Sequence, residues 1–133
     1  MDIDAYEERA NDTNLMGENH LYFLLALLAE VREVAQYIRV DDPTIQGLLR
    51  NLDTVGSDAD NVAKLMRNRG AWYDYTIDSS NTALLKELGD CAWPLFMLAR
   101  ACGFRSSDVL STNLEKLADR KLRGTIASSG DNR

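Results

Sequence analysis

Two pairs of carboxylates stand out in this sequence because of their spacing. Glu30 and Glu33 form one pair, and Glu87 and Asp90 form the other, each spaced i, i+3. On a helix, this spacing places both acids of a pair on the same side. Carboxylates supply the oxygen ligands that hard divalent cations prefer. The residues therefore predict a site for Mg²⁺, with Mn²⁺ as a substitute.

The apolar surroundings of each pair strengthen this prediction. Each pair lies on a seam with the alternating spacing of three and four residues that faces a partner helix. The first seam contains Phe23, Ala26 and Tyr37, and the second contains Ala83, Pro94, Met97 and Ala101. An unpaired buried carboxylate is very costly, so four converging acids would repel one another unless a divalent cation or a raised pKa relieved them, and a cation is the simplest relief. Two solvated pairs on helix surfaces are the alternative, and spacing alone does not decide between these interpretations.

The composition is that of an ordinary globular protein with an acidic balance. The chain has 133 residues, of which 21 are acidic and 15 are basic, giving a net charge of −6. A binder of nucleic acid or of a membrane surface would carry a basic face, so neither partner is expected. The longest apolar stretch, 21–29, is too short to span a bilayer, and the acidic start lacks the basic residues of a secretory signal. We therefore expect a cytoplasmic protein.

The spacing of apolar residues and of capping residues predicts an all-α fold. Leucine and alanine are frequent and only two prolines occur, which favours helix. Gly56-Ser57-Asp58 is expected to end one short helix and to cap the next. The expected helices cover about 4–11, 19–39, 43–55, 58–69, a long segment from a cap at 78–80 to 102, and a last one from a cap at 106 or 107 to 123.

A second polar stripe lies on the last predicted helix. Asn113, Lys116 and Arg120 are spaced by three and four residues, opposite a row of leucines. An amide, an ammonium and a guanidinium on one stripe suit the oxygens of a phosphate chain. A solvated face is the favoured interpretation of this stripe alone, but the four acids favour a phosphate clamp. Trp93, which follows Asp90 closely, is expected in the core or in the wall of the substrate pocket.

Several segments, in this order, resemble the MazG-like family of all-α nucleoside triphosphate pyrophosphohydrolases. Its pattern is an ExxE motif on one helix and an ExxD motif on the next, which Glu30/Glu33 and Glu87/Asp90 match. The matching segments are 6–10 (YEERA) with Thr13, 28–35 (LAEVREVA), 86–93 (KELGDCAW), 113–124 (NLEKLADRKLRG) and the ending 129–133 (SGDNR).

The resemblance implies a fold, an activity and a set of site residues. The fold would be a single domain over 1–133, with a four-helix-bundle core and a polar tail at 125–133. The connection between Glu33 and Glu87 is longer than the usual spacer of the family, so 41–78 is interpreted as a variable helical insert that departs from the family pattern. The activity would be hydrolysis of (deoxy)nucleoside triphosphates to the monophosphate and pyrophosphate, as in nucleotide-pool cleaning. A homodimer or a dimer of dimers is implied as well. The residues implied in catalysis and Mg²⁺ binding are Glu30, Glu33, Glu87 and Asp90, and those implied in substrate binding are Asn113, Lys116, Arg120 and Trp93.

Three residues depart from the family pattern. Arg32 stands where a small residue is usual, Lys86 where a further acid is common, and Pro94 where an aromatic residue is usual. The guanidinium of Arg32 is expected to swing outward or to reach a phosphate. These departures motivate an alternative function, namely a non-catalytic helical protein that binds nucleotides or regulates a partner on the same scaffold.

Overall fold

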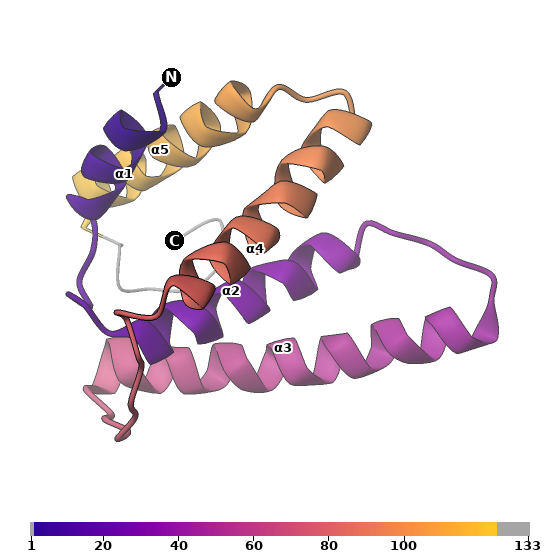
Figure 1. The fold of residues 1–133 in the computed structure, drawn as a ribbon, viewed down its shortest axis with the longest axis horizontal. Coiled ribbons are helices and arrows are strands. Elements are labelled where there is room, and N and C mark those ends of the chain that lie inside the picture. Colours follow the sequence, from indigo (N-terminus) through magenta and orange to yellow (C-terminus); the bar gives the residue numbers. More distant parts are fainter. Residues whose placement is uncertain (1, 125–133) are drawn as a thin grey trace. The chain divides into compact units, whose positions relative to one another are not determined.

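The structure is a computed structural model that describes residues 2–124, and this part of the chain is all-helical. It contains five helices, joined by loops and turns, and no strand. The predicted fold class is therefore confirmed, whereas the polar tail 125–133 and its SGDNR ending lie outside the described residues. The helices are α1 (Ile3–Asn11), α2 (His20–Ala35), α3 (Pro43–Arg69), α4 (Thr82–Ala101) and α5 (Ser106–Arg123) (Figure 1).

The chain forms two compact units. The first, the hairpin unit, covers Leu15–Tyr75 and contains α2 and α3. The second, the discontinuous unit, combines residues 2–14 with residues 76–124 and contains α1, α4 and α5. Each unit carries one of the two acid pairs. None of the helices in the described part of the chain is both long enough and apolar enough to cross a lipid bilayer.

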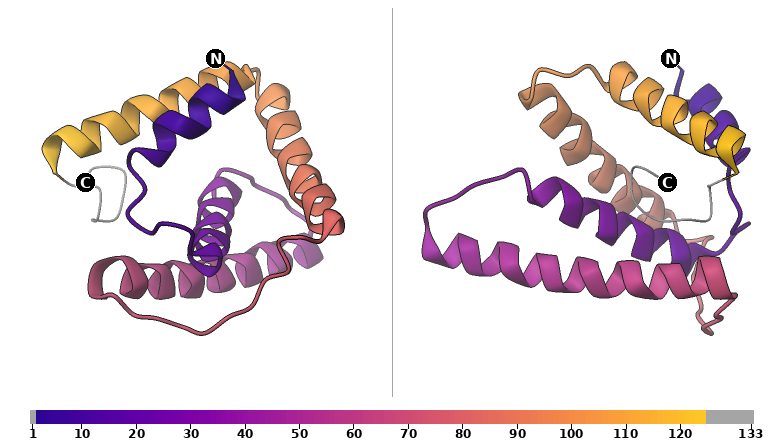
Figure 2. Two further views of the ribbon diagram at one scale, coloured as in Figure 1. Left: turned by 60° about the vertical axis from the view of Figure 1, so that its left-hand side comes forward. Right: turned by 180° about the vertical axis from the view of Figure 1, so that it is seen from behind.

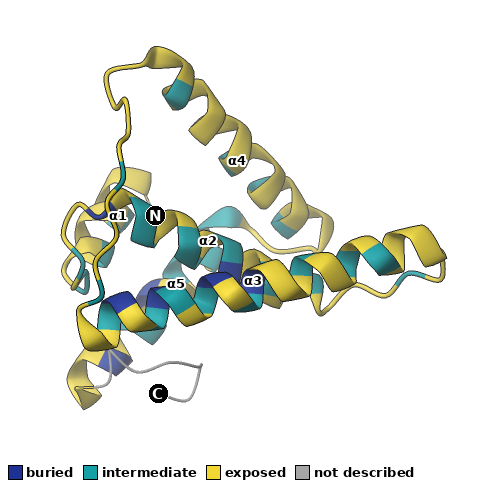
Figure 3. Ribbon diagram, turned by 90° about the horizontal axis from the view of Figure 1, so that it is seen from below, coloured by how far each residue is buried: buried dark blue, intermediate teal, exposed yellow. Residues whose placement is uncertain are grey.

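In the hairpin unit, α2 and α3 run side by side in opposite directions (Figures 1 and 2). Three small residues and one methionine, at intervals of three and four, form the buried stripe of α3, and Figure 3 shows the buried and half-buried positions along the two helices. Small side chains allow two helix backbones to approach closely, which explains the tight contact between α2 and α3. The buried residues of this contact are Ala29 on α2 and Gly56, Ala59, Ala63 and Met66 on α3.

The α3 helix is one continuous element, so the predicted break at Gly56-Ser57-Asp58 is wrong. Its start is as predicted, because the Asp42 side chain accepts a 3.0 Å hydrogen bond from the backbone N–H of Ile45, and Pro43 follows in the first turn. Its end is also as predicted, since Gly70 adopts φ +67° as the C-cap. Gly56 continues the helix and lies instead where α3 packs against α2.

The loop after α3 returns to the beginning of α2. The Tyr75 hydroxyl accepts a 3.0 Å hydrogen bond from the backbone N–H of His20 and donates one of 3.4 Å to the carbonyl of Glu18. It also lies 2.9 Å from Nδ1 of His20. The segments by which the chain enters and leaves the hairpin unit are therefore fastened together through one side chain.

The discontinuous unit is built around α5. The α1 helix packs along α5, and α4 contacts α5 across the short connection after Ala101. Leu114 on α5 is buried, whereas α4 has no buried residue. Gly124 ends α5 at φ +67°, as the sequence predicts for a glycine that terminates a helix. These contacts place Asn113, the first residue of the polar stripe, beside α1.

Candidate functional site

The first acid pair lies in the second half of α2. Asn19 caps this helix, because its side chain accepts a 3.0 Å hydrogen bond from the backbone N–H of Tyr22. Glu30 and Glu33 follow one turn apart, and both are exposed, although their neighbour Ala29 is buried. Local helix geometry thus brings two carboxylates to one side of α2, as the spacing predicts.

Arg32 binds one of these acids directly. Its Nη1 donates a 3.0 Å hydrogen bond to Oε1 of Glu33, and its Nε donates a 2.9 Å hydrogen bond to Oδ1 of Asp53 on α3. Both contacts are ion pairs, and only 23% of the Arg32 side chain is exposed, compared with 56% for Glu33. The guanidinium therefore turns toward α3 and Glu33, and the expectation that it swings outward is wrong.

The close approach of the two helices holds the stem of Arg32 in place. A Cβ atom added to Gly56 would lie 2.4 Å from Cβ, 2.9 Å from Cδ and 3.0 Å from Cγ of Arg32. Such distances mean that the aliphatic part of Arg32 lies directly against the backbone of α3. Sequence reasoning did not identify Asp53, which binds the guanidinium of Arg32, or Gly56, which lies against its aliphatic part. The spacing of Gly56, Ala59 and Ala63 by three and four residues was the available signal.

The second acid pair lies in the first half of α4. Asn81 caps this helix, because its side chain accepts a 2.9 Å hydrogen bond from the backbone N–H of Ala83. Glu87 and Asp90 are both exposed, and Pro94 follows inside the same helix. Trp93 is 68% exposed, so it does not lie in the core of the discontinuous unit. The expectation of a core position for Trp93 is therefore wrong, and its contact with substrate stays a prediction.

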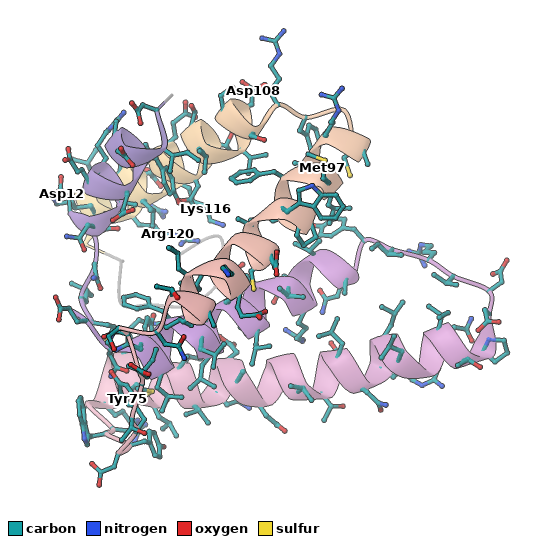
Figure 4. The ribbon with its side chains drawn as sticks, viewed as in Figure 1. Asp12, Tyr75, Met97, Asp108, Lys116 and Arg120 are labelled. Carbon is teal, nitrogen blue, oxygen red and sulfur yellow. The ribbon has the colours of Figure 1, made fainter. Side chains whose placement is uncertain are left out.

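The polar stripe of α5 differs in environment along its length. Asn113 is exposed, Lys116 is half-buried, and Arg120 is only 6% exposed. Lys116 and Arg120 extend from the same side of α5 in Figure 4. Burial of a guanidinium is unusual on a purely solvated face, so the solvated interpretation fits Arg120 poorly.

Asn113 is held from α1. The hydroxyl of Tyr6 donates a 2.7 Å hydrogen bond to Oδ1 of Asn113. Partial burial raises the pKa of Tyr6 above its ordinary value, because the phenolate is poorly solvated there. The neutral hydroxyl is therefore the form that orients the Asn113 amide, leaving its NH₂ group as the available donor.

The two acid pairs belong to different units of the structure. The α2 pair lies in the hairpin unit and the α4 pair in the discontinuous unit. Among residues 2–124, no three or more histidine, cysteine, aspartate or glutamate side chains are arranged to hold a metal ion. The structure thus places the acids in two pairs, and the convergence of all four stays a prediction.

Comparison with known proteins identifies a domain over most of this chain. Residues 18–123 match the family model of the MazG nucleotide pyrophosphohydrolase domain. The chain is also similar to the Gene 37 protein of Mycobacterium phage L5, with 40% identity over 79 residues. That alignment covers 59% of this chain and 66% of the phage protein, slightly less than two thirds of its length. No solved structure has significant similarity to the chain.

Proposed function

Because this chain belongs to the MazG nucleotide pyrophosphohydrolase family, we propose that it hydrolyses (deoxy)nucleoside triphosphates with the help of Mg²⁺. The reaction breaks the α–β phosphoanhydride bond by attack of water and yields the monophosphate and pyrophosphate. The family match carries this proposal, since residues 18–123 include both acid pairs and the polar stripe of α5. Mn²⁺ is expected to substitute for Mg²⁺.

The proposed metal ligands are Glu30, Glu33, Glu87 and Asp90. Their chemistry fits the group, because all four are exposed carboxylates that offer hard oxygen donors, two from each helix. A bound Mg²⁺ would neutralise charge on the phosphates and polarise the attacked phosphoryl group. One of the four carboxylates would also accept the proton of the attacking water.

The proposed substrate contacts come from α5 and α4. Asn113, oriented by Tyr6, would donate from its amide to a phosphate or sugar oxygen. Lys116 and Arg120 would bind phosphate oxygens from the same side of α5. Trp93 offers an exposed aromatic face on which a nucleobase can stack. Positioning and charge neutralisation of this kind account for most catalysis of phosphoryl transfer.

We also propose where the enzyme acts and how it assembles. We expect it to act in the cytoplasm in nucleotide-pool cleaning and to assemble as a homodimer or a dimer of dimers. The large apolar side chains exposed on α4, such as Leu85 and Leu88, agree with assembly through helices. Sedimentation velocity at several protein concentrations measures the oligomeric state directly.

Release of pyrophosphate from a panel of dNTPs with Mg²⁺ tests the activity. Glu33→Gln and Asp90→Asn are expected to lower the rate by about 100-fold or more, because each removes a charge that stabilises the transition state. Glu115→Gln and Asp58→Asn, which change exposed acids outside the proposed site, serve as matched controls. Equal activity in all four variants would contradict the metal-site assignment.

The pairing of Arg32 with Glu33 favours one alternative function. A guanidinium on a proposed metal ligand occupies an oxygen that a cation requires, which suits a protein that binds nucleotide without turnover. In that case, nucleotide with Mg²⁺ would raise the melting temperature while no pyrophosphate is released. Measuring the melting temperature and pyrophosphate release on the same samples separates the enzyme from the sensor.

A further inference from the structure

We infer that Arg32 and Asp53 form a positioning pair that sets how strongly Glu33 binds a divalent cation. The inference rests on the proposed function, because it takes Glu33 as a metal ligand. It adds a role for α3, which lies in the segment that departs from the family pattern. Asp53 acts on Glu33 only through Arg32, and neither residue needs to touch the substrate.

The contacts of one guanidinium carry this inference. Arg32 donates from Nη1 to Glu33 at 3.0 Å and from Nε to Asp53 at 2.9 Å. A single positive charge is thus shared between two carboxylates. Glu33 is therefore only partly neutralised, and its side chain stays 56% exposed. If either carboxylate were lost, the guanidinium would bind the remaining one more strongly.

The packing of α2 on α3 explains why the Arg32 side chain does not turn away from Glu33 into solvent. Its Cβ, Cγ and Cδ lie against the backbone at Gly56, at distances that leave no room for a further methyl group. The side chain is mostly buried at this contact, and its guanidinium emerges beside Glu33. The contact between α2 and α3 therefore holds the positive charge of Arg32 next to Glu33.

This arrangement predicts opposite effects for the two partners. A cation must compete with Arg32 for the oxygens of Glu33, so removal of Arg32 strengthens cation binding. Asp53 draws the guanidinium away from Glu33, so removal of Asp53 weakens cation binding. Because Asp53 acts through Arg32, its removal has no further effect once Arg32 is gone.

Direct titration with Mn²⁺ in the absence of nucleotide tests this prediction. Electron paramagnetic resonance reports the free Mn²⁺ concentration for the full chain and for the Arg32→Gln, Asp53→Asn and double variants. Arg32→Gln is expected to lower the dissociation constant for Mn²⁺ by about two- to fivefold, and Asp53→Asn to raise it by about the same factor, as for a partly exposed ion pair. The double variant is expected to match Arg32→Gln.

A second ion pair on α3 supplies a matched control cycle. Lys64 and Asp60 pair at 2.8 Å on the same helix, so Lys64→Gln, Asp60→Asn and their double variant repeat the same charge changes away from Glu33. These variants are expected to leave Mn²⁺ binding nearly unchanged. Equal shifts of the Mn²⁺ dissociation constant in both cycles would overturn the positioning role. The same holds if the shift in the Arg32→Gln/Asp53→Asn double variant equals the sum of the two single shifts in binding free energy.

The variant Glu33→Gln separates failure of this inference from failure of the proposed function. If Glu33→Gln weakens Mn²⁺ binding but the Arg32 and Asp53 variants do not shift it, only the positioning role is wrong. If Glu33→Gln leaves both Mn²⁺ binding and pyrophosphate release unchanged, the metal-site assignment fails, and the inference fails with it. Circular dichroism of each variant confirms that the helices are retained.

Discussion

The hydroxyl of Tyr6 lies 2.7 Å from Oδ1 of Asn113, and this hydrogen bond joins α1 to α5 across 107 positions of sequence. It connects two segments of the family resemblance, the one that begins at Tyr6 and the one that begins at Asn113. The bond fixes which atom of the Asn113 amide is free to donate. If Asn113 binds substrate as proposed, Tyr6 on α1 affects substrate binding by orienting this amide.

Removal of this hydroxyl is expected to affect substrate binding more than turnover. Tyr6→Phe should raise the KM for the nucleotide by about two- to tenfold, the equivalent of one net hydrogen bond, and change kcat little. Tyr73→Phe is a suitable control, because Tyr73 makes no hydrogen bond through its hydroxyl among the described residues. An equal rise in KM for both variants would argue against the orienting role of Tyr6.

The raised pKa of Tyr6 predicts a loss of stability at alkaline pH. Burial keeps the folded-state pKa above the ordinary value of about 10, so the unfolded chain releases this proton at a lower pH than the folded chain. The stability attributable to Tyr6 is therefore complete below pH 10 and falls as the pH rises through the folded-state pKa. Urea unfolding between pH 9 and about 11.5 should show a shallower fall for Tyr6→Phe than for Tyr73→Phe.

Gly56 is expected to tolerate no larger side chain. Gly56→Ala should destabilise the protein by about 1–3 kcal/mol, since the new methyl group would lie 2.4 Å from Cβ of Arg32 and would push α3 away from α2. Gly47→Ala on the same helix meets only the end of the Arg50 side chain, at 3.7 Å. That variant should instead stabilise the protein by about 0.5–1 kcal/mol. Thermal unfolding measures both changes, and a shared sign would contradict the close contact.

The cap at the start of α2 is expected to be important for stability. Asn19 is 7% exposed and accepts a hydrogen bond from the backbone N–H of Tyr22, so Asn19→Ala leaves this half-buried donor without its acceptor. A loss of about 1–2 kcal/mol is expected, and Asn19→Asp should retain most of the stability. Urea denaturation of the two variants gives the comparison. If Asn19→Asp is as unstable as Asn19→Ala, the capping interaction is not the cause.

The sequence predicts both ends of α3 correctly, whereas the cap of α4 is Asn81 and not a residue at 78–80 as predicted. Asp42-Pro43 marks the start of α3 and Gly70 marks its end, because a cap and a left-handed residue act on their own backbone neighbours. At Gly56 the predicted helix break is wrong because the role of this residue is not local. Its lack of a side chain serves the contact with Arg32 on another helix, and this tertiary contact outweighs the low helix propensity of glycine.

The same distinction applies to the candidate site. The pairing of Glu30 with Glu33, and of Glu87 with Asp90, follows from the i, i+3 spacing within single helices. The ion pair of Arg32 with Asp53 spans 21 positions and depends on how α2 and α3 are aligned, which spacing does not contain. Sequence reasoning therefore finds the acids but not the guanidinium that binds one of them.

The contact of Tyr75 with Glu18 and His20 joins the two ends of the hairpin unit. Residues added to the loop between α2 and α3 would lengthen the hairpin at the end opposite Tyr75. They would leave the distance between the first and last segments of the unit unchanged. Exchange of whole hairpins between relatives, cut at Glu18 and Tyr75, should be the most readily tolerated form of recombination.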